Sequence, residues 1–357
     1  MLVLKNRVAA ARAFLQRFDV DAILFSDIKD VRYLSGFSGS EGVLLLGDTE
    51  VFLFTDSRYT TQAAKEASGC KIIECSNKAA EIASRIVGFG SCNLGFQAEN
   101  ITVAFYEELH RSLPEVRLVS VGTETGSLRS VKDCSEIETL AKAAAIASES
   151  FEDILSMIRP GISEKDVALQ LELTLRGKGA DGKSFDFIVA SGERGALPHG
   201  RASEKLLSSG ELVTVDFGAT LDGYASDETV TIAVGEVNAM QREVYQIVKD
   251  AHDKAIEAVR PGVDLKHLDA LARDYISNKG FGDFFRHGLG HGVGLDVHEK
   301  PVVSFRSEGE VVEGMVFTIE PGIYMPGWGG VRIEDTVCVT SNGCSLLTKV
   351  SKELIVL

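Results

Sequence analysis

The sequence predicts two domains: an α/β domain over residues 1–127 and an α+β domain over residues 128–357 that is built from a duplicated helix-helix-hairpin unit. Three observations predict this organisation. The chain has 357 residues, which is longer than a single hydrophobic core usually grows. Short apolar segments alternate with helix-forming segments in its first third. Four segments of the remainder recur in the same order further along the chain.

The first domain is predicted from segments of strand length that alternate with helical ones. The strand candidates are AILF, VLLL, VFLF and KII, which begin at residues 22, 43, 51 and 71. Helices are expected at residues 1–18, 59–67 and 78–87. This alternation is typical of an α/β domain. Residues 122–133 are rich in turn formers and are the predicted linker.

The second domain opens with a helix predicted over residues 135–158, and it contains the internal repeat. The repeated pairs are RPG at 159 and 260, GELVTVDFG at 210 with GMVFTIEPG at 314, DETV at 227 with EDTV at 334, and His199 with His298. Each RPG lies between two amphipathic helices, and the next residues that can cap a helix are Ser163 and Asp264. The nearly constant offset indicates two copies of one unit.

The first repeat places two acidic residues on one face of a hairpin. Its strands flank Asp222-Gly223, which is a strong signal for a two-residue turn. This turn sets Gly218 opposite Asp227. Because residues two apart share a face of a strand, Asp216 and Asp227 are predicted to be diagonal neighbours.

The second repeat makes Glu320 and Glu334 the equivalent pair, joined by a glycine-rich loop over residues 321–333. Because the acids border apolar segments of strand length, we expect them in a covered sheet. Removing each unpaired carboxylate from water costs several kcal/mol. Arg332 is the one basic residue close to them in sequence, whereas two divalent cations would supply four positive charges.

A neutral imidazole is the natural fifth ligand. The glycine-rich segment HGLGHGVGLDVHE, residues 287–299, offers three histidines, and His291 is the predicted ligand because backbone can approach closely there. Oxygen-dominated coordination with one imidazole favours Mn, Co or Fe over a structural zinc site. We therefore expect two divalent ions of Mn, with Co or Zn as alternatives.

These residues resemble those of the pita-bread metallopeptidases, which include methionine aminopeptidase, aminopeptidase P and prolidase. The resemblance rests on HGLGHGVGLDVHE, TIEPG and VRIED, while VRYLSGFSGSEG and FTDSRYTTQA look like the N-terminal domain of the proline-specific branch and of creatinase. It therefore covers the whole chain and implies a pita-bread fold for residues 128–357. The segment SDETVT departs from the family pattern S-D-x-T-R-T, because Val230 replaces Arg. This puts in doubt a salt bridge or substrate contact.

The resemblance also implies the roles of the ligands. Asp227 and Glu334 would bridge the two metal ions. Asp216 would bind one ion, and His291 with Glu320 would bind the other. Glu320 would in addition move protons during hydrolysis.

Hydrolysis of Xaa-Pro dipeptides, the prolidase reaction, is the predicted activity. We expect His298 to stabilise the oxyanion, His199 to contact the proline side of the substrate, and His287 to be structural or to line the pocket. A dipeptidase must also bind the free carboxylate of its substrate, for which His199 and Arg332 are the candidates. Glu299, which follows the third histidine, favours prolidase over aminopeptidase P, where Asp commonly follows.

Four alternatives are open. An Xaa-Pro aminopeptidase resembling aminopeptidase P would share the site but act on longer peptides. A peptide-binding pita-bread protein without catalysis, or a creatinase-like enzyme that works without metal, would not need the intact ligand set. Methionine aminopeptidase normally lacks the N-terminal domain.

Charge and composition limit the partners. A net charge of −15 disfavours nucleic acid and anionic membranes. The chain has no apolar segment near 20 residues and no signal-peptide core, which predicts a cytoplasmic protein. Six scattered cysteines without a C-x-x-C pair fit reduced, mostly buried thiols. The resemblance implies small peptide substrates with proline second, and a homodimer.

Overall fold

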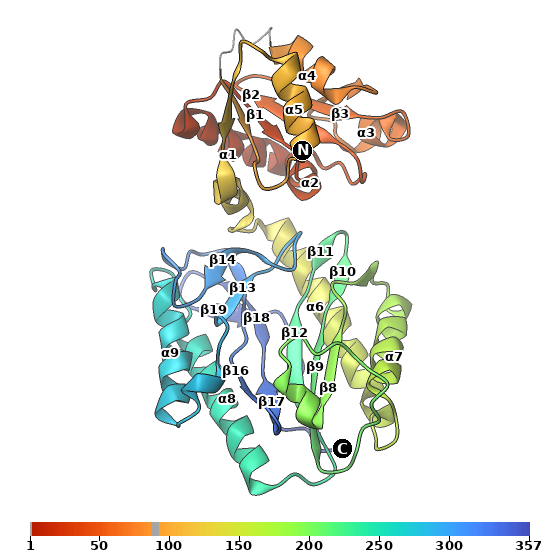
Figure 1. Cartoon of the computed structure of the whole chain (residues 1–357), viewed down its shortest axis with the longest axis vertical. Coiled ribbons are helices and arrows are strands. Elements are labelled where there is room, and N and C mark those ends of the chain that lie inside the picture. Colours follow the sequence, from red (N-terminus) through yellow and green to blue (C-terminus); the bar gives the residue numbers. More distant parts are fainter. Residues whose placement is uncertain (1, 87–92) are drawn as a thin grey trace. The chain divides into compact units, whose positions relative to one another are not determined.

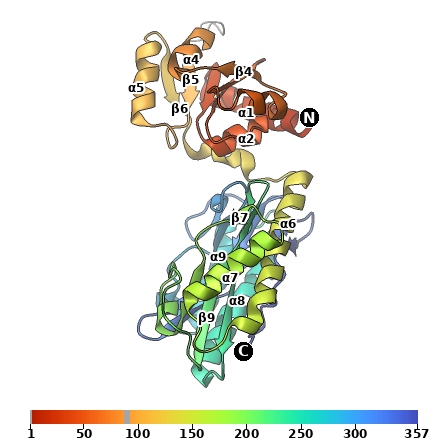
Figure 2. The same ribbon diagram turned by 90° about the vertical axis from the view of Figure 1, so that its right-hand side faces the viewer.

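The computed structural model of the chain describes residues 2–86 and 93–357. The chain divides into two compact units, Met1–Arg129 and Ser130–Leu357, each with its own hydrophobic core (Figures 1 and 2). Val87, in the third predicted helix, and Cys92 lie outside the described residues. No helix in the described part of the chain is long and apolar enough to cross a membrane.

The first unit contains a six-stranded mixed sheet in the order β4-β3-β2-β1-β5-β6. Its strands are β1 (Ala22–Phe25), β2 (Val43–Gly47), β3 (Val51–Thr55), β4 (Lys71–Glu74), β5 (Asn93–Phe96) and β6 (Arg117–Ser120). The three central strands are antiparallel and buried throughout, and the outer strands join them in parallel. The four strands predicted from the sequence are therefore confirmed.

Five helices of the described residues belong to the same unit as this sheet. They are α1 (Leu2–Phe18), α2 (Ile28–Ser35), α3 (Thr60–Glu66), α4 (Lys78–Ile86) and α5 (Val103–Ser112). Apolar residues of α4 and α5 pack with the strands in one core. The predicted linker is partly regular, because Gly122–Arg129 forms a 3-10 helix in which Arg129 Nη1 lies 2.8 Å from the buried carboxylate of Asp30.

The expectation for the cysteines was wrong in part. Among the described residues Cys338 is buried, three cysteines are half-buried and Cys134 is exposed, and all are free thiols.

In the second unit two helix pairs each precede a set of strands. The helices are α6 (Cys134–Ile154), α7 (Glu164–Gly177), α8 (Ala239–Ala258) and α9 (Leu265–Asn278). A 3-10 turn over Leu155–Met157 extends α6, as the predicted helix over 135–158 requires. The hydroxyl of Ser163 accepts from Asp166 N, and the carboxylate of Asp264 accepts from Lys266 N, so both predicted helix caps are confirmed.

The strands form two main sheets, ordered β12-β9-β8 and β14-β13-β15-β18-β19, with two small sheets beside them. The strands of the main sheets are β8 (Ile188–Ser191), β9 (Glu211–Phe217), β12 (Glu228–Val234), β13 (Gly290–Gly292), β14 (Glu299–Val303), β15 (Val316–Ile319), β18 (Asp335–Val339) and β19 (Cys344–Leu346). The small sheets contain β7 (Gly182–Lys183), β10 (Ala219–Leu221), β11 (Tyr224–Ala225), β16 (Gly322–Met325) and β17 (Gly329–Arg332).

Alternation along β9 separates the core from the site. Val213, Val215 and Phe217 pack with α6 and α7 in one core. Thr214 and Asp216 face the other side of the strand, where the Thr214 hydroxyl lies 3.1 Å from that of Thr231 on β12. The helices therefore cover one face of this sheet and leave the acidic face for the site.

Val230 belongs to the helix-covered face. It is 3% exposed and packs in the same core as β9, so this position contributes no side chain to the acidic face. The departure from the family pattern at Val230 therefore does not remove a charged group from the cavity.

The first hairpin has the predicted register. Asp222 and Gly223 have φ values of 46° and 72°, as a two-residue turn with two left-handed positions requires. Phe217 pairs with Glu228 and Thr220 pairs with Ala225, which sets Gly218 opposite Asp227.

The two main sheets meet at a seam. Glu334 N donates to Thr229 O at 3.1 Å, and the Thr231 hydroxyl donates to Arg332 O at 2.8 Å. The predicted loop over residues 321–333 is instead a short hairpin of β16 and β17. The seam therefore brings segments from both predicted repeats side by side.

Behind the acidic face lies a buried charged cluster that anchors the C-terminal segment. Glu228 and Asp335 are buried, and Lys352 Nζ lies 2.5 Å from Glu228 Oε1 and 3.2 Å from Asp335 Oδ1. His252 Nε2 lies 3.2 Å from the other oxygen of Asp335. The cluster joins β12 and β18 immediately beside the acidic residues that face the cavity.

We predict that Lys352→Met lowers the free energy of unfolding by about 3–5 kcal/mol, because two buried carboxylates lose their cation. The matched control is Lys349→Met, whose side chain is exposed and which should change stability by about 0.5 kcal/mol or less. Urea unfolding monitored by circular dichroism measures both. Equal stability of the two variants would show that Lys352 does not neutralise the cluster.

Candidate metal centre

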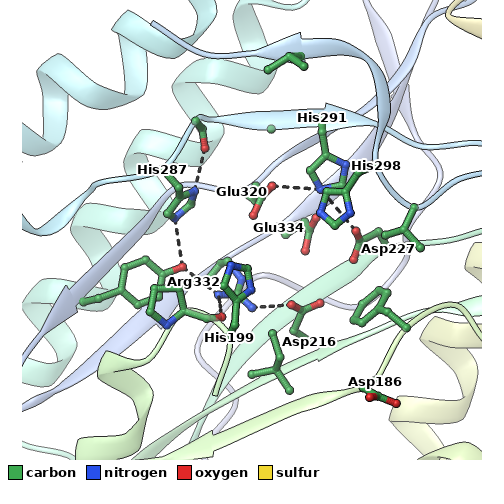
Figure 3. A pocket seen from close by; sticks show the side chains of 18 of the residues that line it. Asp186, His199, Asp216, Asp227, His287, His291, His298, Glu320, Arg332 and Glu334 are labelled. Carbon is green, nitrogen blue, oxygen red and sulfur yellow. Dashed lines mark hydrogen bonds and ion pairs between the residues drawn. The ribbon is translucent and has the colours of Figure 1, made fainter. Parts of the chain in front are cut away.

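The five predicted ligands lie around one cavity of about 580 Å³ in the second unit (Figure 3). The strands that carry them come from both predicted repeats. Asp216 lies near the end of β9, Asp227 directly precedes β12, His291 is in β13, Glu320 directly follows β15, and Glu334 directly precedes β18. The sequence reasoning therefore selected residues that the fold brings together.

Short distances connect the members of this set. One ligand atom each from Asp227, His291 and Glu334 lies within 4.8 Å of the other two. His291 Nε2 is 3.3 Å from Glu320 Oε1 and 3.7 Å from Asp227 Oδ2. Imidazole and carboxylate groups at this spacing can share a metal ion.

The glycines beside His291 allow this approach. A Cβ atom at Gly290 would lie 1.9 Å from Thr318 O, and one at Gly292 would lie 2.2 Å from Lys300 O. No other residue fits at either position without moving the neighbouring strand. The expectation that backbone approaches closely in this segment is confirmed.

Burial and mutual repulsion strongly raise the pKa values of three of the acids. The pKa of Asp227 and the pKa of Glu334 are raised well above their usual values, first by burial and then by neighbouring carboxylates. Burial raises the pKa of Glu320 to about 8, although Arg332 opposes this. Burial lowers the pKa of His291, so its imidazole is neutral and able to bind a cation.

The residues fit divalent metal ions. Asp216 Oδ1 is buried and, in the described part of the chain, has no hydrogen-bond partner, which leaves an anionic oxygen that a cation would satisfy. Four carboxylates with one imidazole are a ligand set that suits two divalent ions. A cation would also remove the repulsion that raises the pKa values of the acids.

Arg332 is tied to the ligand set. It is 4% exposed, and its Nη2 donates to Asp216 Oδ2 at 2.5 Å. Its Nε donates to Thr229 Oγ1, and its Nη1 donates to Pro198 O and to the Tyr324 hydroxyl. These contacts use four of the five N–H donors of a guanidinium. Arg332 thus lines the cavity, but one of its N–H donors holds Asp216 and three more are used by Thr229, Pro198 and Tyr324.

His287 and Tyr324 extend this network (Figure 3). His287 Nδ1 donates to Gly288 O at 2.8 Å, so the neutral ring presents Nε2 as an acceptor to the Tyr324 hydroxyl at 3.2 Å. Burial and the nearby Arg332 lower the pKa of His287 to about 4, which keeps the ring neutral. The chain of contacts from His287 to Asp216 positions a predicted ligand from outside the ligand set.

The sequence reasoning missed Tyr324 and two threonines. The Thr229 hydroxyl donates to Glu334 Oε2 at 2.7 Å, and the Thr318 hydroxyl donates to Glu320 Oε1 at 3.4 Å. Both threonines lie two residues from a predicted ligand and therefore on its face of the strand. That spacing was an available signal, whereas Tyr324 had none because its hairpin was predicted as a loop.

His199 and His298 line the same cavity. The rings of His298 and His291 lie 4.1 Å apart between centroids. Desolvation and the neighbouring His291 lower the pKa of His298 to about 4, so it is neutral at pH 7 and can donate from one nitrogen. Both histidines therefore lie on the wall of the cavity that the five predicted ligands share.

Glu299 does not line this cavity. Its Oε1 lies 2.9 Å from Lys132 Nζ, and both side chains are almost fully buried. A Cβ atom at Gly294 would lie 2.3 Å from the same carboxylate oxygen. Glu299 therefore holds the turn that leads to His298, and it carries no direct information on the substrate.

Comparisons with known proteins agree with the two-domain fold. Metallopeptidase family M24 matches residues 138–341, and the creatinase/prolidase N-terminal domain matches residues 7–131. An Xaa-Pro dipeptidase of Pyrococcus horikoshii is 40% identical over 357 residues, which cover 99% of this chain and 100% of the relative.

Two solved structures are similar along their length. An Xaa-Pro dipeptidase from Bacillus anthracis has a TM-score of 0.96 and 42% identity, with 99% of this chain and 100% of that one covered. An X-Pro aminopeptidase from Thermotoga maritima has a TM-score of 0.88 and 36% identity, with 96% and 99% covered.

The fold and the acidic cavity define a two-domain metallopeptidase of the pita-bread type. The chain belongs to metallopeptidase family M24.

We predict that the free energy of unfolding of the metal-free protein falls as pH rises from about 6.5 to 8. Folded acids with raised pKa values keep protons that the unfolded chain has lost, so each retained proton costs about 1.4 kcal/mol per pH unit. Histidines with lowered pKa values oppose this trend near pH 6.5, where the unfolded chain still binds protons at them, and oppose it little above about pH 7.5, where they are mostly neutral in both states.

Thermal unfolding with chelator and with saturating Mn²⁺ measures the effect. The melting temperature of the metal-free protein should fall across this range, and that of the Mn²⁺ form should change less. Parallel curves with and without metal would contradict the assignment of these acids as ligands.

Proposed function

We propose that the chain is an Xaa-Pro dipeptidase that uses two divalent metal ions. The observation that carries the proposal is the convergence of Asp216, Asp227, His291, Glu320 and Glu334 on one cavity of a family M24 chain. The two relatives named Xaa-Pro dipeptidase support the substrate class, since both match along almost the whole chain.

The proposed ligand roles follow the resemblance and the distances. Asp216, Asp227, His291, Glu320 and Glu334 would together hold the two ions. Bound ions would polarise the scissile carbonyl and lower the pKa of a water molecule. Glu320 would take the proton of that water and give it to the proline nitrogen as the bond breaks.

The two histidines at the cavity wall would bind the substrate. His298, which is neutral at pH 7, would donate a hydrogen bond to the developing oxyanion. His199, at the cavity wall, would contact the proline side of the substrate. The backbone that carries His199 is held in place, because the carbonyl oxygen of the adjacent Pro198 accepts a hydrogen bond from Arg332. Arg332 would act mainly on Asp216 and only secondarily, through its remaining N–H, on substrate.

We propose Mn²⁺ as the metal, with Co²⁺ or Zn²⁺ as alternatives, because oxygen ligands outnumber nitrogen in the set.

The five residues lie between positions 216 and 334, which supports residues 128–357 as the catalytic domain and residues 1–127 as an accessory domain. We further propose a cytoplasmic homodimer in which the accessory domain limits substrate length. A mass of one chain, 38.5 kDa, in light scattering would reject the dimer.

We also propose that the catalytic domain is a duplicated helix-helix-hairpin unit. Helices α6 and α7 pack with β9 and β12 in one core, while α8 and α9 pack with β15 and β18 in another. The acids Asp216 and Glu320 lie at or just beyond the ends of β9 and β15, whereas Asp227 and Glu334 directly precede β12 and β18. This correspondence supports the repeat.

The second candidate is an Xaa-Pro aminopeptidase that cleaves longer peptides. Similarity to the X-Pro aminopeptidase from Thermotoga maritima favours it. A peptide-binding protein without catalysis is the third candidate, and the buried ligand set opposes it because unneeded buried acids would destabilise the fold.

The substrate preference is tested with Met-Pro, Met-Pro-amide and a tripeptide that begins with Met-Pro, in the presence of Mn²⁺. A charge-assisted contact to the substrate carboxylate contributes about 1.5–3 kcal/mol, so kcat/KM for Met-Pro should exceed that for its amide at least about tenfold. Glu320→Gln is the control, and it should lose about 100-fold or more in kcat on every substrate. Equal values for acid and amide, or faster cleavage of the tripeptide, would favour the aminopeptidase.

A further inference from the structure

A dipeptidase of the proposed kind needs a cation for the free carboxylate of its substrate, and the inference below rests on that proposed function. Among the described residues that line the cavity, the arginines are Arg201 and Arg332. Arg332 is buried and donates to Asp216, Thr229, Pro198 and Tyr324. Arg332 therefore keeps one N–H for a substrate, which is too few for the paired contact that a guanidinium makes to a carboxylate. Arg201 makes none of these contacts.

The strand pairing places Arg201 in line with the metal centre. Ile188 on β8 pairs with Asp216 on β9, and on its other side Ile188 forms a bridge with Arg201. Residues directly opposite each other in paired strands project on the same face. Arg201 therefore shares the face of Asp216 at a distance of two strand spacings, or about 10 Å between Cα atoms.

This separation suits a dipeptide. Ile188 and Arg201 both line the cavity, so the face between Asp216 and Arg201 is open to a substrate. In an Xaa-Pro dipeptide the carboxylate is two bonds from the proline nitrogen, and an arginine side chain is long enough to reach toward it from two strands away. A longer peptide would place an amide at this point.

The backbone of Arg201 is held firmly. Arg194 Nη2 donates to Arg201 O at 2.6 Å, and Arg194 Nε lies 3.0 Å from the carboxylate of Glu164. Glu164 is fully buried and also accepts from the hydroxyls of Ser191 and Ser203. The segment that carries His199 and Arg201 is therefore anchored at both ends, which suits a residue that must orient substrate.

The guanidinium of Arg201, in contrast, is available. Its side chain is 79% exposed, and its ion pair with Asp186 is long, at 3.5 Å. Lys183 Nζ lies 3.1 Å from the other oxygen of Asp186, so that carboxylate keeps a cation when Arg201 turns away. Figure 3 shows Asp186 apart from the ligand set, beyond Asp216.

We propose that Arg201 binds the C-terminal carboxylate of the dipeptide and is the residue that determines the preference for dipeptides. Its two parallel N–H groups match a carboxylate, which Lys183, as a point charge, does not. On binding, Arg201 exchanges the exposed contact with Asp186 for the substrate carboxylate, and Asp186 remains paired with Lys183.

The test measures kcat/KM for Met-Pro and for Met-Pro-amide with Mn²⁺-loaded wild type, Arg201→Gln, Arg201→Lys and the exposed control Arg260→Gln. Arg201→Gln should lower the value for Met-Pro at least about tenfold, mainly through KM, and should change the amide less than about threefold. Arg201→Lys should fall between wild type and Arg201→Gln. Arg260→Gln should match wild type on both substrates.

The possible failures are distinguishable. If wild type cleaves neither substrate, the proposed function fails. If wild type prefers the acid and Arg201→Gln keeps that preference, the dipeptidase assignment stands and the role of Arg201 is wrong. Equal losses on acid and amide would likewise overturn it, because they would show that Arg201 only supports the fold of the cavity.

Discussion

Four carboxylates share one buried face at the seam of the two main sheets, and the rest of the catalytic unit is organised around their negative charge. Keeping these carboxylates ionised at this face is unfavourable, because burial and mutual repulsion raise the pKa values of three of them. Arg332 supplies one positive charge and the threonines supply hydrogen bonds, but together these leave the set far from neutral. Without metal the acids are compensated in part by protons that they retain, and divalent cations would replace those protons.

The strands that carry the acids are held by an apolar core on one face and by a second charged cluster beside the site. Alternation along β9 and β12 directs apolar side chains to the helices and acids to the cavity. Directly beside Asp227 and Glu334, the next residues Glu228 and Asp335 point to a separate buried cluster that contains Lys352. The strand ends that carry the acids are thus fixed on both faces. The same cavity is also lined by His199, His298 and Arg201.

The sequence was sufficient to predict the five residues that converge on one cavity, the division into two units and the first hairpin, because each depends on local rules. Period-two alternation, a two-residue turn and a repeat offset are all visible in one dimension. The contacts of Arg332 and Glu299 were not predictable, because Arg332 reaches across the seam and Glu299 pairs with Lys132 from a distant segment. Arg201 was overlooked for a related reason, since only strand pairing through Ile188 places it in line with Asp216.

The central claim is that this set of acids is neutralised by two ions in one site. Isothermal titration of the metal-free protein with Mn²⁺, with activity followed on the same samples, tests it most directly. The account predicts two ions per chain at saturation, with full activity only when both are bound. Saturation at one ion per chain together with full activity would contradict it.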